Sequence, residues 1–157
     1  VLPDGARAYA REQLVLVVPE QLAEAPTSFA GIKAGIKRLA VADPNRTVLG
    51  RQTQSVLWSL NFLGQLDVAT DAGGVLDHVL SGQADAGIIF RHEAVKERER
   101  IRVAAVADSG YEPITHSMAM ERYCPNRTLC EDFLVFAQSA EAQKILAGMG
   151  YLPPDGR

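Results

Sequence analysis

The sequence has little of several features on which common functions depend. Only two of its 157 residues are cysteines and three are histidines, so a metal centre built from clustered Cys and His ligands has few candidates. No apolar run approaches the roughly 20 residues of a membrane-spanning helix. Phosphate-loop Gly-Lys-Ser, nucleophile-elbow and dinucleotide Gly-x-Gly-x-x-Gly motifs do not occur. We therefore expect binding rather than catalysis, with no cofactor.

The charge pattern gives no sign of a basic surface. The formal net charge is -3, the pI is near 5.6, and acidic and basic residues are interspersed. Such a chain has no stripe that would follow a phosphate backbone, so we expect no nucleic-acid partner. With 47% hydrophobic residues, the chain is expected to fold as one globule of domain size. Its first residues do not form a signal peptide, so export would require a signal that has been removed.

Apolar runs alternate with helical patterns along most of the chain. The runs indicate strands at residues 14–18, 38–42, 66–69 and 86–90, with further candidates at 101–106 and 114–120. Between them, helical patterns occupy residues 29–34, 51–63 and 74–80. This alternation predicts the α/β class, with a mostly parallel sheet flanked by helices, and the run 14–18 predicts a strand inside that sheet.

The end of the chain predicts two helices in tandem. Thr128 and Glu131 form a capping box for the first, and Ser139 opens the second. Just before them, Cys124 and Cys130 lie close together in a loop, which suits a local disulfide in an oxidising compartment. Adjacent free thiols are the alternative.

Two expected helices begin shortly after strands, at Gly50 and at residues 71–74. Since the carboxyl ends of parallel strands meet at one edge of a sheet, both helix starts are expected at the same edge. A helix start offers unpaired N–H groups and the positive end of the macrodipole, which together suit an anion. We expect the donors to be the amides of Leu49, Gly50, Ala72 and Gly73. Ordinary capping by Asp71 and ordinary turn glycines explain the same pattern.

Other candidate residues are weaker. Arg91 follows the strand at 86–90, where its charge could complement an anion, and a surface salt bridge with Glu93 is the alternative. The sequence from His92 to Lys96 resembles a zinc-binding helix, but Lys96 stands where the second histidine is needed, so we discard it.

Four segments in order resemble the periplasmic molybdate-binding proteins of ABC transporters: residues 9–19, 37–44, 81–90, and 133–146 together with 150–153. The resemblance implies a type 2 periplasmic-binding fold, in which two α/β lobes hold an oxyanion between them through backbone amides and hydroxyls. It further implies molybdate or tungstate as ligand, ABC membrane subunits as partners, and a periplasmic or extracellular, membrane-anchored location. An effector-sensing domain of a transcription regulator, with the same fold, is the alternative function.

The resemblance extends to single positions. Leu49 and Ala72 match site residues of the family, and Phe90 matches a tyrosine that gives its hydroxyl to the ligand. A phenylalanine cannot donate that bond, so Arg91, Thr47 or water would have to replace it.

Members of this family carry most of their first lobe before the segment that matches the start of this sequence. The resemblance therefore implies that residues 1–120 form the second lobe with hinge strands, and that 121–157 are C-terminal helices of the first lobe. The chain is then either a fragment or a protein that has lost this lobe. We expect half a cleft to bind molybdate weakly. The apolar faces carrying Leu129, Phe133, Ile145 and Leu146 would favour a homo-oligomer.

Overall fold

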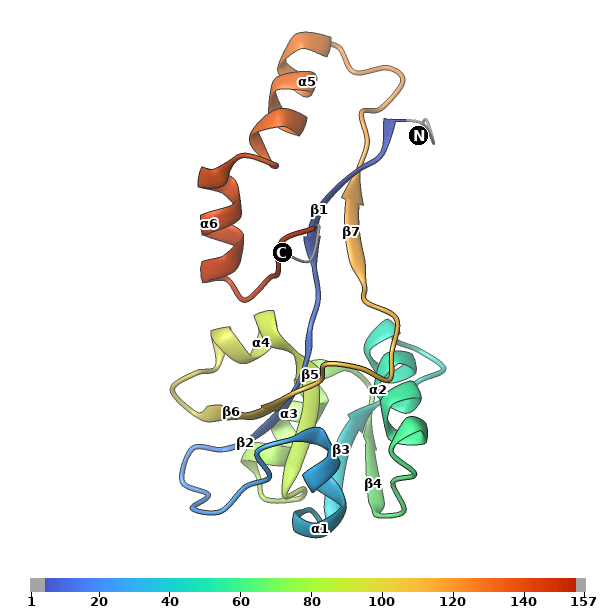
Figure 1. Cartoon of the computed structure of the whole chain (residues 1–157), viewed down its shortest axis with the longest axis vertical. Coiled ribbons are helices and arrows are strands. Elements are labelled where there is room, and N and C mark those ends of the chain that lie inside the picture. Colours follow the sequence, from blue (N-terminus) through green and yellow to red (C-terminus); the bar gives the residue numbers. More distant parts are fainter. Residues whose placement is uncertain (1–4, 155–157) are drawn as a thin grey trace. The chain divides into compact units, whose positions relative to one another are not determined.

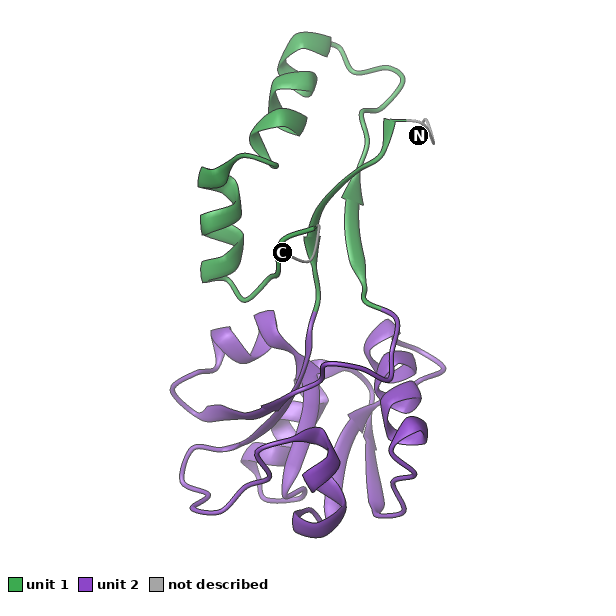
Figure 2. Cartoon of the chain, viewed as in Figure 1, with its two compact units in different colours: residues 1–12, 113–157 green, residues 13–112 purple. Residues whose placement is uncertain are grey.

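The computed structural model describes residues 5–154, which fall into two compact units (Figure 2). Unit 2 is Gln13–Glu112, and unit 1 combines Val1–Glu12 with Pro113–Arg157. These bounds differ from the expected division after residue 120. The physical reason is strand pairing: β1 (Arg7–Arg11) pairs antiparallel with β7 (Thr115–Met118), which joins the start of the chain to its C-terminal part. The assignment of the units to lobes of a two-lobed protein stays a prediction.

Unit 2 is a five-stranded sheet with helices between its strands, so the α/β class is confirmed (Figure 1). The strand order is β4-β3-β5-β2-β6. Its elements are β2 (Leu14–Pro19), η2 (Phe29–Gly31), α1 (Ile32–Gly35), β3 (Arg38–Ala42), α2 (Val48–Ser59), β4 (Gln65–Ala69), α3 (Ala72–Leu80), β5 (Ala86–Phe90), α4 (Arg91–Lys96) and β6 (Ile101–Val106).

The sheet is mixed, and β2 is the reversed strand. β3 runs parallel to both β4 and β5, as expected, whereas β2 pairs antiparallel with β5 and with β6. The prediction that residues 14–18 lie in a parallel part of the sheet was therefore wrong. These residues are fully buried because β2 lies between two neighbours in the interior of the unit. Burial on both faces produces a continuous apolar run whatever the strand direction.

Helices α2 and α3 cover opposite faces of the sheet. A Cβ built on Gly87 of β5 would lie 2.6 Å from Val75 and 2.9 Å from Val79, so α3 packs closely over this glycine. Gly87 pairs with Ala40, which therefore shares its face. On the other face, Leu57 of α2 lines a hollow together with Val41, next in sequence to Ala40. The two faces together bury the apolar core of the unit.

The bounds of α2 differ from the expected ones at both ends. The helix begins at Val48 rather than Gly50, because Thr47 caps it by accepting the Gly50 N–H at 2.9 Å. It ends at Ser59, and Asn61 follows with a φ of 51°, the left-handed conformation that asparagine tolerates. Gly64 is therefore not the residue that stops the helix.

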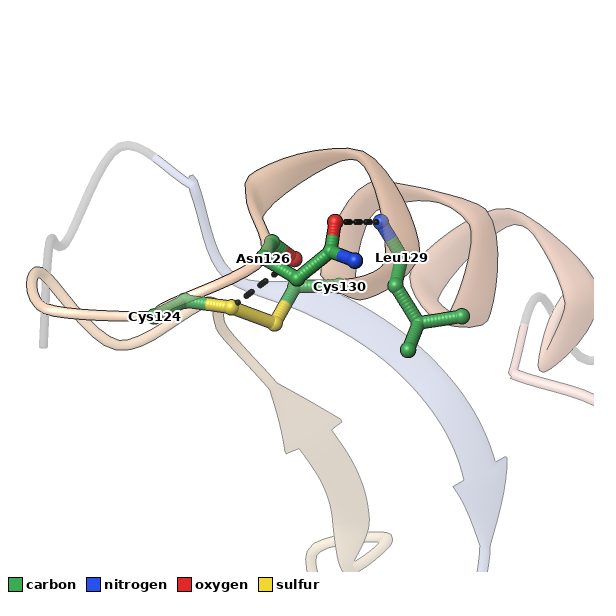
Figure 3. Close-up of a disulfide and its surroundings, with 4 residues drawn as sticks. All are labelled: Cys124, Asn126, Leu129 and Cys130. Carbon is green, nitrogen blue, oxygen red and sulfur yellow. Dashed lines mark hydrogen bonds between the residues drawn. A yellow bond between two sulfur atoms is a disulfide. The ribbon is translucent and has the colours of Figure 1, made fainter.

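Unit 1 consists of β1, β7, α5 (Arg127–Phe136) and α6 (Ala140–Gly148). The expected cap of α6 is confirmed, since Ser139 accepts the Ala142 N–H at 3.2 Å. The expected capping box of α5 is wrong: Asn126, one residue before the helix, accepts the Leu129 N–H at 3.1 Å (Figure 3). Thr128 already lies inside the first turn, where its side chain is too late to cap.

A disulfide joins Cys124 to Cys130, so the alternative of free thiols is excluded (Figure 3). Cys130 belongs to the first turns of α5 and Cys124 to the loop before it. The bond therefore ties this loop to the helix that it precedes. No helix within residues 5–154 is long and apolar enough to cross a membrane.

Candidate functional site

The candidate site lies where three parallel strands end. β4, β3 and β5 are consecutive neighbours with the same direction, so their carboxyl ends share one edge of the sheet. A hydrogen bond of 2.8 Å from the Asp43 N–H to the Ala69 carbonyl joins the segments that follow β3 and β4. Seven of the eight predicted site residues follow these three strands, and the eighth, Phe90, is the last residue of β5: Thr47, Leu49, Gly50, Asp71, Ala72, Gly73, Phe90 and Arg91. The structure thus brings them to one edge, and their role in binding stays a prediction.

The start of α2 offers two backbone donors. Thr47 accepts the Gly50 N–H through its hydroxyl oxygen, and this hydroxyl donates to the Asp43 carbonyl at 3.0 Å. Within residues 5–154, no acceptor is found for the N–H groups of Val48 and Leu49. The Leu49 N–H therefore has no acceptor in this range, as expected, whereas the Gly50 N–H is bonded to Thr47. The second N–H without an acceptor is that of Val48 instead of Gly50. Sequence reasoning missed the Val48 N–H because it placed the helix start at Gly50, two residues too late.

The start of α3 repeats this arrangement. Asp71 accepts the Gly74 N–H at 3.0 Å, so the capping alternative is correct for this residue. The cap and the expected donors coexist, because the N–H groups of Ala72 and Gly73 find no acceptor in the described part of the chain. The Asp71 carboxylate also places a negative charge at this helix start, which offsets part of the attraction that the macrodipole exerts on an anion.

Packing explains one of the glycines in this region. A Cβ at Gly50 would lie 2.5 Å from the carbonyl oxygens of Ala42 and Asp43, so α2 approaches the end of β3 too closely for any side chain there. At Gly73 the nearest atom is a carboxylate oxygen of Asp71 at 3.3 Å, at the end of a flexible side chain. The glycine at position 50 is therefore a structural requirement and does not by itself indicate a ligand.

Phe90 and Arg91 complete the edge from β5. The Phe90 N–H donates to a carboxylate oxygen of Glu93 at 3.1 Å, and the Phe90 ring stacks on His92 with 6.2 Å between centroids. The Arg91 guanidinium donates to the side-chain oxygen of Gln13 at 3.1 Å. This bond holds the cation at the start of β2. The ring of Phe90 carries no hydrogen-bonding group, as expected from its identity.

The donor set of this edge is therefore made of backbone amides. Neutral N–H groups at the positive ends of two helices suit the oxygen atoms of a small anion. In residues 5–154 no three His, Cys, Asp or Glu side chains gather where they could hold a metal cation. The arrangement can hold an oxyanion by hydrogen bonds.

Several known proteins are similar to this chain. Residues 1–152 match the family described as bacterial extracellular solute-binding protein. YvgL of Bacillus subtilis (strain 168), whose name describes it as an ABC transporter substrate-binding lipoprotein, is 26% identical over 144 residues, which are 88% of this chain and 55% of YvgL. The molybdate-binding protein ModA of Haemophilus influenzae is 26% identical over 117 residues, 72% of this chain and 46% of ModA. The chain thus spans about half the length of these relatives.

Two solved structures confirm the fold. A substrate-binding domain from Clostridium difficile, described as that of a molybdenum ABC transporter, superposes with a TM-score of 0.88 at 24% identity, covering 98% of this chain and 68% of that one. The periplasmic molybdate-binding protein of Azotobacter vinelandii gives 0.70 at 23% identity, covering 98% and 70%. At these identities the likeness establishes the fold, which is the expected type 2 periplasmic-binding fold.

Proposed function

The chain belongs to the family of bacterial extracellular solute-binding proteins, and from this premise we propose that it binds a small tetrahedral oxyanion, molybdate or tungstate. We propose further that it does so as part of the solute-binding component of an ABC importer. The single observation that carries the ligand class is the shared edge at which α2 and α3 begin, each with two amides that find no acceptor in the part of the chain that the structure describes. Names of relatives that refer to molybdate support the choice of anion.

The proposed binding follows from the geometry of the two helix starts. In each, the cap residue accepts the third N–H of the helix, and the first two point away from the helix without a partner in the described chain. Four donors at one edge can each bond one oxygen lone pair of a dianion, and charge-assisted bonds of this kind are about twice as strong as neutral ones. The donors are those of Val48, Leu49, Ala72 and Gly73.

Binding by this chain alone should be weak. The curated relatives are about twice as long as the segment that this chain matches. All four proposed donors lie at one edge of the sheet and would contact only one side of the anion. Water would remain on its other side and weaken each hydrogen bond by screening. We therefore propose that further polypeptide completes the site in the full binding protein.

Family membership also supports the proposed location and partners. The family and the name of YvgL describe extracellular and lipoprotein substrate-binding proteins, so we propose an extracytoplasmic location and ABC membrane subunits as partners. The family match favours transport over an effector-sensing domain of a transcription regulator. It equally favours binding over enzymatic turnover.

A proline substitution can remove one of the proposed donor N–H groups and leave the capping side chain of the helix in place. Ala72 is the first residue of α3 and follows Asp71 in extended conformation, so Ala72→Pro fits the helix and deletes only one N–H. Ala140→Pro makes the same change at the first residue of α6, after extended Ser139, and serves as the matched control.

The measurement is a titration of the ¹⁵N-labelled chain with molybdate, tungstate and sulfate, followed by amide chemical shifts. We expect the largest shifts at the four donor amides, and a loss of molybdate affinity of roughly tenfold or more in Ala72→Pro, the cost of one hydrogen bond to a charged group. Ala140→Pro should bind like the parent chain. Shifts confined to other residues, or equal losses in both variants, would overturn the proposal.

A further inference from the structure

The two helix starts at the candidate site have caps of different charge. Thr47 caps α2 with a neutral hydroxyl, which donates its own proton to the Asp43 carbonyl. Asp71 caps α3 with a carboxylate, one oxygen of which accepts the Gly74 N–H at 3.0 Å. An ionised carboxylate can accept hydrogen bonds but cannot donate one. The start of α3 therefore combines an anionic acceptor with the proposed donors.

The Asp71 carboxylate lies beside these donors. The oxygen that caps the helix would lie 3.3 Å from a Cβ built on Gly73 and 3.8 Å from one built on Gly74, so the carboxylate stands over the first turn of α3. Asp71 is exposed, and it forms no ion pair with a basic side chain in the described part of the chain. An anion bound to the amides of Ala72 and Gly73 would therefore meet this negative charge at close range.

Two other carboxylates follow strands at this edge, and both are engaged in their own turns. Asp43 accepts the Asn45 N–H at 2.8 Å. Glu93 accepts the Phe90 N–H, the last of β5, at 3.1 Å. Asp71 is the one that is next in sequence to proposed donors.

We propose that Asp71 is a specificity-determining residue of this site and selects oxyanions that carry a proton. The inference rests on the proposed function, which supplies the site, and adds a ligand class to it. An oxygen that bears a proton can donate to the carboxylate, and such charge-assisted bonds are about twice as strong as neutral ones. A bare oxygen of a fully ionised anion can only face Asp71 as a like charge, which disfavours binding.

Hydrogen phosphate belongs to the ligand class that this arrangement favours. Phosphate keeps at least one proton at neutral pH, whereas sulfate, which has nearly the same size, keeps none. Molybdate and tungstate resemble sulfate in this respect. A proton on the ligand turns the repulsion by Asp71 into a hydrogen bond, so phosphate should compete with molybdate for the site.

The test compares phosphate with sulfate, because their similar size isolates the effect of the proton. The ¹⁵N-labelled chain is titrated with each anion, and the amide shifts of Ala72 and Gly73 give the dissociation constants. Asp71→Asn keeps a side-chain oxygen that caps the helix about equally well and removes the charge. We expect the preference for phosphate over sulfate to fall roughly tenfold or more in this variant, and the affinity for molybdate to rise.

Asp85→Asn is the matched control. Asp85 is also an exposed carboxylate that accepts backbone N–H groups, those of Lys37 and Arg38, but it lies where β3 and β5 begin, at the opposite edge of the sheet. This variant loses the same charge from unit 2 and should keep the preference of the parent chain. If the anions bind but the preference changes equally in both variants, or does not change in Asp71→Asn, the specificity is overturned and the proposed function stands.

Arsenate and selenate repeat the comparison on the unmodified chain, so this measurement does not depend on how a variant folds. Arsenate keeps a proton at neutral pH and selenate does not, and we expect arsenate to bind roughly tenfold more tightly. Equal affinities would overturn the inference. If no anion shifted the donor amides in the parent chain or in Asp71→Asn, the proposed function would fail, and the inference with it.

Discussion

Gly50→Ala should destabilise unit 2 more than any other glycine substitution at the candidate site. The added Cβ would lie 2.5 Å from two backbone carbonyl oxygens, those of Ala42 and Asp43. The Asp43 oxygen cannot move alone. The Asp43 carbonyl accepts the Thr47 N–H at 3.0 Å, the Thr47 hydroxyl at 3.0 Å and the Arg46 N–H at 3.2 Å. Relieving the overlap therefore loosens the turn that leads into α2.

The size of the effect follows from these distances. Ordinary contacts of a Cβ begin near 3.4 Å, so α2 must withdraw by almost 1 Å from the end of β3. Overpacking of this kind costs about 1–3 kcal/mol, even though alanine is the better helix former. For a unit of the size of Gln13–Glu112, that is a fall in Tm of roughly 4–8 °C for each kcal/mol. Thermal unfolding followed by circular dichroism measures it.

Gly73→Ala is the matched control. It lies in the first turn of α3, as Gly50 does in α2, but its Cβ would meet only the flexible Asp71 carboxylate. We expect unchanged stability or a gain of up to about 1 kcal/mol, because alanine restricts the unfolded chain. Equal Tm values for Gly50→Ala and the parent chain would refute the packing argument, as would an equal fall in both variants.

Three further predictions concern single groups. Removing the Cys124–Cys130 disulfide opens a short loop and should destabilise unit 1 by about 2 kcal/mol. Faster hydrogen exchange of the α5 amides would report this loss of stability, and unchanged exchange would contradict it. Thr53→Val removes a buried hydroxyl that has no hydrogen-bond partner among residues 5–154, and it should raise the free energy of unfolding, measured by urea denaturation, by about 1 kcal/mol. A lower free energy of unfolding contradicts this. Phe90→Tyr restores the hydroxyl that the family resemblance places there and should tighten molybdate binding roughly tenfold by calorimetry; unchanged affinity would argue against that correspondence.

The sequence predicted the bounds of three strands of unit 2, two of them inside the sheet and one, β6, at its edge. The expected bounds of β3, β5 and β6 match the structure, because each is a compact apolar run between turn residues. The direction of β2 could not be read in the same way. Its neighbours β5 and β6 come more than 60 residues later in the chain, so pairing depends on tertiary structure that a local pattern does not contain.

Strand β1 was missed for a related reason. Its sequence, Arg-Ala-Tyr-Ala-Arg, is short and half polar, and it pairs with residues more than 100 positions away, Arg7 with Met118 for example. No local pattern distinguishes such a strand from a polar loop. The same pairing decides the bounds of the two units, which is why the expected division after residue 120 differs from the structure.

The candidate site shows a further limit of residue patterns. Its proposed donors are backbone N–H groups, which every residue except proline carries, so the identities of Val48, Leu49 and Ala72 reveal nothing about them. The glycine that drew most attention, Gly50, is explained by packing, and its N–H is occupied by Thr47.

What the sequence does contain is the position of the caps. Thr47 and Asp71 each accept the N–H three residues later, at Gly50 and Gly74, which leaves the two amides between cap and third residue free to bind. A cap that follows the end of a parallel strand thus locates available donors more reliably than a glycine does. Applied to α2, this rule would have placed the helix start at Val48 and included its amide. It also explains why Ala72→Pro, which keeps the cap and deletes one of these amides, separates ligand binding from helix stability.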